Sequence, residues 1–166
     1  MTDAARNTTV PTGPVIITSR FDVADGYTYE GYVRTGGYRA LRKALNEMSP
    51  QQVHDQVRAS EIQGRGGAGF PAGTKWGFLP PDVLPRYLVV NGDESEPGTY
   101  KDRLLMELDP HQLIEGVVIS CYAFSAAQAF VYVRGEMALA QERLAQALND
   151  AYENGLVGRN VCGTSF

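Results

Sequence analysis

Apolar residues recur at helical spacing in several stretches of the chain, and two short runs between those stretches are continuously apolar. Recurrence at every third or fourth position predicts a helix with one buried face, whereas a short apolar run bounded by turn residues predicts a buried strand. The helical stretches are 37–45, 49–64, 110–125 and 137–154, and the apolar runs are 87–90 and 129–133. The strand–helix–strand–helix order from 87 to 155 predicts parallel strands joined by a right-handed crossover.

Two of the predicted helices begin with the same signal. Ser49-Pro50-Gln51-Gln52 and Asp109-Pro110-His111-Gln112 each supply a capping residue, a proline at the first helical position and a glutamine at the third. In the first of these helices, we expect Val53, Val57 and Ile62 to form the buried face.

The remaining segments show weaker periodicity. Residues 1–36 are predicted to form an irregular, extended arm whose tyrosines pack on their own domain, and residues 91–108 to form a long polar loop. We therefore expect an α/β fold in three parts: the arm at 1–36, a helical segment with a glycine-rich loop at 37–73, and the beginning of a Rossmann-like domain at 74–166.

Composition narrows the classes of function. The chain has 166 residues, 43% of them hydrophobic and 20% charged, with a net charge of −4. These values are typical of one globular domain and argue against a nucleic-acid binder. The most apolar stretch, 113–133, contains Glu115 and Ser120, so we expect no transmembrane helix. Cys121 and Cys162 lack metal-ligand spacing and are expected to be buried, reduced thiols.

A glycine-rich loop lies between a predicted helix and the first predicted strand. Its first six residues, Gly64-Arg65-Gly66-Gly67-Ala68-Gly69, match the pattern G-x-G-x-x-G. The usual dinucleotide fingerprint, however, follows a strand and opens a helix. The Walker A pattern also fails, because Thr74 separates Gly73 from Lys75. A loop that serves packing alone is therefore one interpretation.

The side chains around the glycines favour a second interpretation. Arg65 and Lys75 are residue types that hold phosphate groups. Phe70, Trp76 and Phe78 offer flat faces on which a base or a flavin ring can stack. Together with the glycines, these residues predict a nucleotide-binding loop.

A second loop with candidate chemistry runs from Asn91 to Gly98, at the predicted carboxyl end of the first strand. Open α/β sheets bind their ligands at that end. Asp93, Glu94 and Glu96 could form a plain solvated loop or bind a hard cation, although their spacing is not that of an EF-hand. They could also accept hydrogen bonds from ribose hydroxyls or flavin N–H groups. We assign no metal site and no catalytic residue to this loop.

Four motifs occur in one order along the chain: GRGGAGFPAGTKW, YLVVNGDESEPGTYKDR, DPHQLIEG and VYVRGE. Because of these motifs, the chain resembles the N-terminal part of the NADH-binding FMN flavoprotein subunit (F type) of respiratory complex I. The resemblance covers residues 37–166. The resemblance implies hydride transfer from NADH to FMN, followed by one-electron transfer to iron–sulfur clusters. Family members carry alanine before Asp93, and Gly92 at this position is expected to loosen the loop slightly.

The resemblance also implies binding roles. Phe70 and Phe78 would stack on the adenine of NADH, and Glu96 would face its nicotinamide. FMN would contact Gly64, Arg65, Gly66, Gly67, Lys75, Asn91, Asp93 and Glu94. NADH would contact Arg65, Gly66, Gly67, Ala68, Gly69, Phe70, Pro71, Ala72, Gly73, Thr74, Phe78 and Glu96. His54 and His111 are expected to have surface or capping roles.

The same resemblance implies an assembly. The partners would be a thioredoxin-like 2Fe–2S subunit and a large multi-cluster iron–sulfur subunit. Together they would form a peripheral arm on the cytoplasmic side of the plasma membrane, with no transmembrane segment in this chain. The cysteines for a 4Fe–4S cluster are expected in the full-length subunit but not in this chain. Alternatives are a diaphorase subunit of a soluble NAD-linked hydrogenase or formate dehydrogenase, and a non-catalytic nucleotide-binding assembly module.

Overall fold

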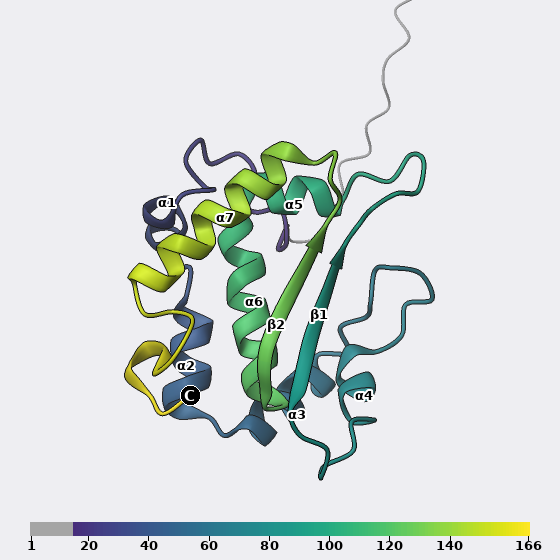
Figure 1. Cartoon of the computed structure of the whole chain (residues 1–166), viewed down its shortest axis with the longest axis vertical. Coiled ribbons are helices and arrows are strands. Elements are labelled where there is room, and N and C mark those ends of the chain that lie inside the picture. Colours follow the sequence, from purple (N-terminus) through teal and green to yellow (C-terminus); the bar gives the residue numbers. More distant parts are fainter. Residues whose placement is uncertain (1–14) are drawn as a thin grey trace, which may run out of the picture.

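The computed structural model describes residues 15–166, and its centre is a parallel β-α-β unit. Strands β1 (Arg86–Gly92) and β2 (Ala126–Val133) pair in parallel, with Val89 opposite Phe130. Helix α6 (Pro110–Ala123) connects them and packs on the sheet, and helix α7 (Ala138–Glu153) packs on α6 (Figure 1). The predicted α/β class and the parallel pairing are confirmed.

Five short helices and a 3₁₀ turn complete the described part of the chain. They are α1 (Tyr29–Arg34), α2 (Arg39–Glu47), α3 (Pro50–Ala59), α4 (Ala72–Trp76), α5 (Asp102–Leu108) and the 3₁₀ turn η1 (Val161–Gly163). The capping box at the start of α3 is confirmed, because Ser49 Oγ accepts from the Gln52 backbone N–H and the Gln52 side chain accepts from the Ser49 N–H.

Two predicted details of the helices are wrong. Helix α3 ends at Ala59, and Ile62 lies beyond it with 54% of its surface exposed. The chain turns at Glu61, whose φ is +54°, so helical spacing does not continue to Ile62. Asp109 precedes α6 but makes no capping hydrogen bond. Its carboxylate instead binds Arg20 Nε at 2.7 Å, because a long-range cation competes with the local backbone donors.

The segment 15–36 is not an irregular arm. It contains α1, and Tyr32 on this helix is buried with 2% of its surface exposed. The Tyr32 side chain packs in one core cluster with Leu41, Ile114 and Ala147, so α1, α2, α6 and α7 share that core. Residues 1–14 of the predicted arm lie outside the described part of the chain. The domain boundaries at 36 and 73 stay predictions.

The core contains a polar network centred on Glu115 of α6. One carboxylate oxygen accepts hydrogen bonds from the Tyr32 hydroxyl and from the Tyr38 backbone N–H (2.9 Å), and the other accepts from the Leu41 N–H (2.9 Å). Tyr38 immediately precedes α2, and Leu41 lies in the first turn of that helix. A buried acceptor at a helix N-terminus satisfies donors that the helix itself leaves unpaired. Glu115 therefore fixes α2 and α1 onto α6.

His111 belongs to the same core, which corrects the expected surface or capping role. Its side chain is fully buried, and its Nδ1 lies 2.8 Å from the Tyr38 hydroxyl. Its Nε2 lies 3.6 Å from a carboxylate oxygen of Asp150. Burial lowers the pKa of His111, and the nearby Asp150 carboxylate only partly opposes that effect. His111 lies in the first turn of α6, on the side of the helix that faces the core. Its neighbours in the sequence did not indicate this burial.

The predicted loop at 91–108 is also more ordered than expected. Its second half forms α5, and the Glu94 carboxylate accepts hydrogen bonds from the Asp102 N–H (2.6 Å) and the Arg103 N–H (2.8 Å). Because these are first-turn donors of α5, Glu94 stabilises that helix from outside it. The cap comes from eight residues upstream, a distance beyond the usual capping patterns.

The two strands are covered on one face only. Tyr87, Val89, Phe130 and Tyr132 expose 57%, 68%, 50% and 58% of their surfaces. The expectation of buried strands is therefore wrong for this face of the sheet within residues 15–166, because the helices of this part of the chain pack on the α6 face. In the same described range, no helix combines the length and apolar character needed to cross a membrane. Cys121 is buried, Cys162 is half-buried, and both are free thiols.

Candidate functional site

The glycine-rich loop projects from a short antiparallel stem. The Gly64 N–H donates to Phe70 O at 2.9 Å, and the Ala72 N–H donates to Ile62 O at 2.8 Å. Gln63 and Pro71 form an isolated antiparallel bridge between these bonds. The stem thus closes the loop at its base and leaves residues 65–69 as a tip.

The tip has free backbone donors and free space. Within residues 15–166, the backbone N–H groups of residues 65–70 donate no hydrogen bond. A Cβ placed on Gly66 or Gly67 would meet no atom of the described chain within 4 Å. Packing inside this structure therefore does not explain why Gly66 is glycine. Exposed donors beside an open approach are what a phosphate-binding loop presents to its ligand.

Gly73, at the other end of the loop, has a packing role. It is buried in α4, and a Cβ there would lie 2.4 Å from the Arg58 Cα of α3. The Gly73 carbonyl accepts a hydrogen bond from His54 Nε2 at 2.7 Å. His54 is half-buried, and its hydrogen bond to α4 is a contact that the expected surface or capping role did not include. The packing interpretation thus holds for Gly73, whereas the nucleotide-binding interpretation of the glycines at the tip stays a prediction.

The aromatic residues of the loop divide in the same way. Phe70 and Phe78 expose 48% and 69% of their surfaces, and their ring centroids lie 5.9 Å apart at an interplanar angle of 49°. Trp76 is half-buried and packs edge-on against Phe124, with the centroids 5.4 Å apart. The two phenylalanine rings are therefore available for stacking on a flat ligand, whereas the Trp76 ring packs within the protein.

The acidic loop after β1 is organised by its own side chains. Asn91 Oδ1 accepts from the Asp93 N–H at 2.9 Å, and the Asp93 carboxylate accepts from the Ser95 hydroxyl. Burial acts to raise the pKa of Glu94, but hydrogen bonds from the backbone N–H groups of Arg103 and Asp102 outweigh it and hold that pKa below its ordinary value. Glu94 is therefore a carboxylate at neutral pH, with both oxygens already bound to α5.

Gly92 is the last residue of β1 and not part of the loop. It is buried opposite Val133, and a Cβ there would lie 2.9 Å from Tyr132 O and 3.0 Å from Met106 Sδ. The absence of a side chain at this position therefore allows β1 to pack closely on β2 and on Met106. The expected loosening of the following loop stays a prediction.

A cleft of about 540 Å³ lies beside this loop, at the carboxyl ends of the strands. Its charged lining consists of Glu94, Glu96, Arg103, Glu107, Arg134 and Glu136. The sequence reasoning missed Arg103 and Arg134. Arg134 directly follows β2, so the rule that ligands bind at the carboxyl ends of parallel strands could have identified it.

The predicted site residues thus lie on two separate segments. Glu94 and Glu96 line the cleft, but within residues 15–166 its lining includes no residue of the glycine-rich loop and neither Lys75 nor Phe78. In Figure 1, the loop before α4 and the loop after β1 both extend on the β1 side of the sheet. The same described range contains no cluster of three histidine, cysteine or acidic residues suited to a metal ion.

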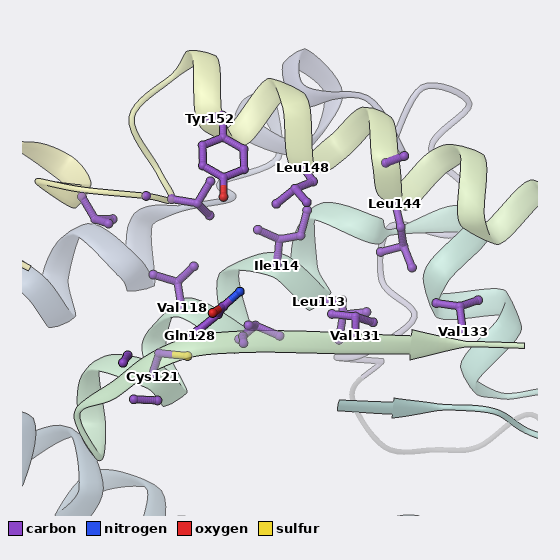
Figure 2. A pocket seen from close by; sticks show the side chains of 18 of the residues that line it. Leu113, Ile114, Val118, Cys121, Gln128, Val131, Val133, Leu144, Leu148 and Tyr152 are labelled. Atoms are coloured by element: carbon purple, nitrogen blue, oxygen red, sulfur yellow. The ribbon is translucent and has the colours of Figure 1, made fainter. Parts of the chain in front are cut away.

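A different cavity, of about 640 Å³, lies between β2, α6 and α7. Figure 2 shows that Leu113, Val118, Val131 and Leu144 point into it from these three elements. No predicted site residue lines it. The lining is largely aliphatic, with Gln128, Gln141 and Tyr152 among its polar side chains, and within the described residues it contains no lysine or arginine that could bind a phosphate group.

Proteins with similar sequences show the family of the chain. The chain is 51% identical over 154 residues to an F-type subunit of the NADH-quinone oxidoreductase of Rhizobium meliloti (strain 1021), covering 92% of this chain and 36% of that protein. It is 47% identical over 137 residues to the F-type subunit of the NADH-quinone oxidoreductase of Escherichia coli (strain K12), covering 81% and 31%. The chain thus spans about a third of the length of these relatives.

A solved structure is similar in fold. A chain in the crystal structure of an NAD⁺-reducing [NiFe]-hydrogenase in the H₂-reduced state is 34% identical, with a TM-score of 0.55, covering 72% of this chain and 22% of that chain. Residues 57–164 match the family described as the Nuo51 FMN-binding domain, a range that includes the glycine-rich loop, the acidic loop and both strands. The chain belongs to the Nuo51 FMN-binding domain family.

Proposed function

We propose that the chain supplies part of the NADH- and FMN-binding site of an NADH:quinone oxidoreductase, where electrons from NADH enter the respiratory chain. The observation that carries this proposal is the tip of the glycine-rich loop, where backbone donors and open space meet at Gly66 and Gly67. The similarity to F-type subunits of NADH-quinone oxidoreductases supports the reaction class.

The residues present fit the two cofactors. The free N–H groups of residues 65–70 match phosphate oxygens, and Arg65 and Lys75 are exposed cations beside them. Phe70 and Phe78 are exposed rings close enough to act on one base, although their tilt must change to enclose it. When bound, FMN supplies the hydride acceptor, since no protein side chain can take a hydride from NADH.

The protein contributes binding and orientation. Hydride transfer requires the donor carbon and the acceptor nitrogen to be held at near-attack distance, which the loop contacts and stacking rings provide. The exposed Glu96 carboxylate is available to the nicotinamide end. Glu94 acts differently, because its oxygens bind α5 and thereby hold the acidic loop in place. This refines the direct FMN contact expected for Glu94.

The assembly follows from the same proposal. The partners are the thioredoxin-like 2Fe–2S subunit and the multi-cluster iron–sulfur subunit, in a peripheral arm on the cytoplasmic side of the plasma membrane. The 4Fe–4S ligands belong to the full-length subunit. A diaphorase subunit of an NAD-linked hydrogenase is the second candidate, favoured by the similarity to the NAD⁺-reducing [NiFe]-hydrogenase. Co-purification separates the two candidates. Subunits of a quinone reductase would accompany the chain under the first, and hydrogenase subunits would accompany it under the second.

The test substitutes a tip glycine that has no packing role. In the full-length subunit, Gly66→Ala introduces a methyl group where the ligand approaches the backbone. We expect the KM for NADH in ferricyanide reduction, or the Kd for FMN, to rise about tenfold, equivalent to about 1.4 kcal/mol. The free energy of unfolding should change by less than about 0.5 kcal/mol, since the new Cβ meets no neighbour.

Gly116→Ala is the matched control. Gly116 is exposed on α6, and a Cβ there also meets nothing within 4 Å, so nucleotide binding should be unchanged. Unaltered binding of both cofactors by Gly66→Ala would contradict the site assignment. Nucleotide binding without bound flavin or NADH:ferricyanide activity would instead identify the non-catalytic assembly module.

A further inference from the structure

His54 connects helix α3 to the far end of the glycine-rich loop. Its Nε2 lies 2.7 Å from the Gly73 carbonyl oxygen. A carbonyl oxygen only accepts hydrogen bonds, so Nε2 carries the proton and donates. The imidazole ring also packs near the Trp76 indole, with their centroids 6.1 Å apart. The histidine therefore contacts both ends of the short helix α4.

The position of α4 determines how the loop is held. Gly73 packs directly on the α3 backbone, because any side chain there would collide with Arg58. The stem residue Ala72 opens the same helix, and Lys75 lies one turn further on. Any shift of α4 away from α3 would therefore move the loop stem and Lys75 together.

The tip depends on that stem for its order. Within the described residues, the N–H groups at 65–70 make no hydrogen bonds that could fix the tip. Each residue that must be ordered upon ligand binding costs conformational entropy, which weakens the observed affinity. A stem that is already fixed lowers this cost before the ligand arrives.

We propose that His54 is a positioning residue of the nucleotide site, which fixes α4 on α3 through its Nε2–H bond to Gly73 and so pre-orders the glycine-rich loop and Lys75. The inference rests on the proposed function, since it assumes that the loop binds nucleotide. His54 touches no reacting atom. Its loss should weaken ground-state binding and leave the hydride-transfer step unaffected.

Three variants test this role. His54→Leu removes the donor, His54→Gln keeps an N–H that can reach the Gly73 carbonyl, and Gln56→Leu places the same apolar side chain on the exposed face of α3. Hydrogen exchange of peptides covering residues 64–77 is measured in the 166-residue chain. The KM for NADH and the kcat of ferricyanide reduction are measured in the full-length subunit.

We expect His54→Leu to speed exchange in residues 64–77, at amides such as those of Gly64, Ala72, Lys75 and Gly77 that donate hydrogen bonds. We also expect it to raise the KM about fivefold, with kcat within twofold of the parent. Fivefold corresponds to about 1 kcal/mol, the usual value of one hydrogen bond. His54→Gln should restore most of both effects, and Gln56→Leu should show neither. If His54 only stabilised the fold, its replacement by leucine would lower the free energy of unfolding without raising the KM selectively. Glutamine would then not restore the KM.

Two results would overturn the inference. One is unchanged exchange at residues 64–77 in His54→Leu, and the other is a KM that moves equally in His54→Leu and His54→Gln. Failure of the proposed function has a different signature: exchange accelerates in His54→Leu and recovers in His54→Gln, while neither His54→Leu nor Gly66→Ala changes the KM for NADH. In that case His54 orders a loop whose ligand is not this nucleotide.

Discussion

Replacing the buried Glu115 tests whether the polar core network holds α1 and α2 on α6. Its carboxylate serves three donors: Tyr32 O–H and Tyr38 N–H on one oxygen, and Leu41 N–H on the other. A glutamine retains only one acceptor oxygen, so at least one donor must face an amide N–H. A hydrogen bond to a charged group is worth about 1.5–3 kcal/mol, so Glu115→Gln should destabilise the protein by about 2 kcal/mol.

Glu115→Ala removes all three acceptors. The sum of three such bonds overestimates the loss, because water can enter the space left by the side chain and solvate some donors. Breaking one side of a buried charged network costs about 3–5 kcal/mol, so we expect about 4 kcal/mol. Small domains are stable by only about 5–15 kcal/mol, and this variant should therefore be close to unfolding at 37 °C.

Urea unfolding measures both values. Trp76 is the single tryptophan and lies half-buried, so its fluorescence reports unfolding, with far-ultraviolet circular dichroism as a second probe. An unchanged m-value would show that the variants differ in stability alone. Glu142→Ala, on the exposed face of α7, is the control and should cost less than about 0.5 kcal/mol. A cost below about 1 kcal/mol for Glu115→Ala would refute the reasoning.

Three further predictions concern the packing, the pH response and the open sheet face. Gly73→Ala should destabilise the chain by about 1–3 kcal/mol in urea unfolding, because its Cβ would lie 2.4 Å from Arg58 Cα; a neutral substitution would contradict this contact. The pKa of buried His111 is lowered, so below about pH 6.5 the unfolded chain binds a proton at this residue that the folded chain does not bind. The free energy of unfolding should therefore fall as the pH drops below about 6.5, with a slope approaching 1.4 kcal/mol per pH unit. Thermal unfolding from pH 7.5 to 5.5 measures the slope, and a His111→Phe variant with the same slope would exclude this origin. Val89→Ser with Phe130→Ser should reduce the binding of a hydrophobic fluorescent dye at least twofold without unfolding, since both side chains are exposed on one face; unchanged dye binding would place the apolar surface elsewhere.

Local sequence patterns determined much of the fold. The apolar runs predicted both strands, and the Ser49 capping box predicted the start of α3, because those signals depend on neighbouring residues alone. The same patterns failed where partners come from distant parts of the chain. Glu94 caps α5 from eight residues upstream, and Asp109 binds Arg20 across 89 residues instead of capping α6.

The candidate site shows the same division. Motif spacing identified the glycine-rich loop and the acidic loop, and it indicated the family to which the chain belongs. It could not separate a glycine that packing requires from a glycine that faces open space, since the sequence records both only as glycine. Only the neighbours in space make that distinction, because Gly73 lies against Arg58 whereas Gly66 faces open space.

The sequence by itself thus determined both strands, the four longer helices α2, α3, α6 and α7, the parallel order and the family, all of which depend on residue type and spacing. Tertiary structure decided which side chains act on one another. His111 and Glu115 became a buried network, and His54 reached the Gly73 carbonyl 19 residues away. The physical reason is that hydrogen bonds, burial and steric exclusion act over a few ångströms in space, and one chain fixes those distances only when it is folded.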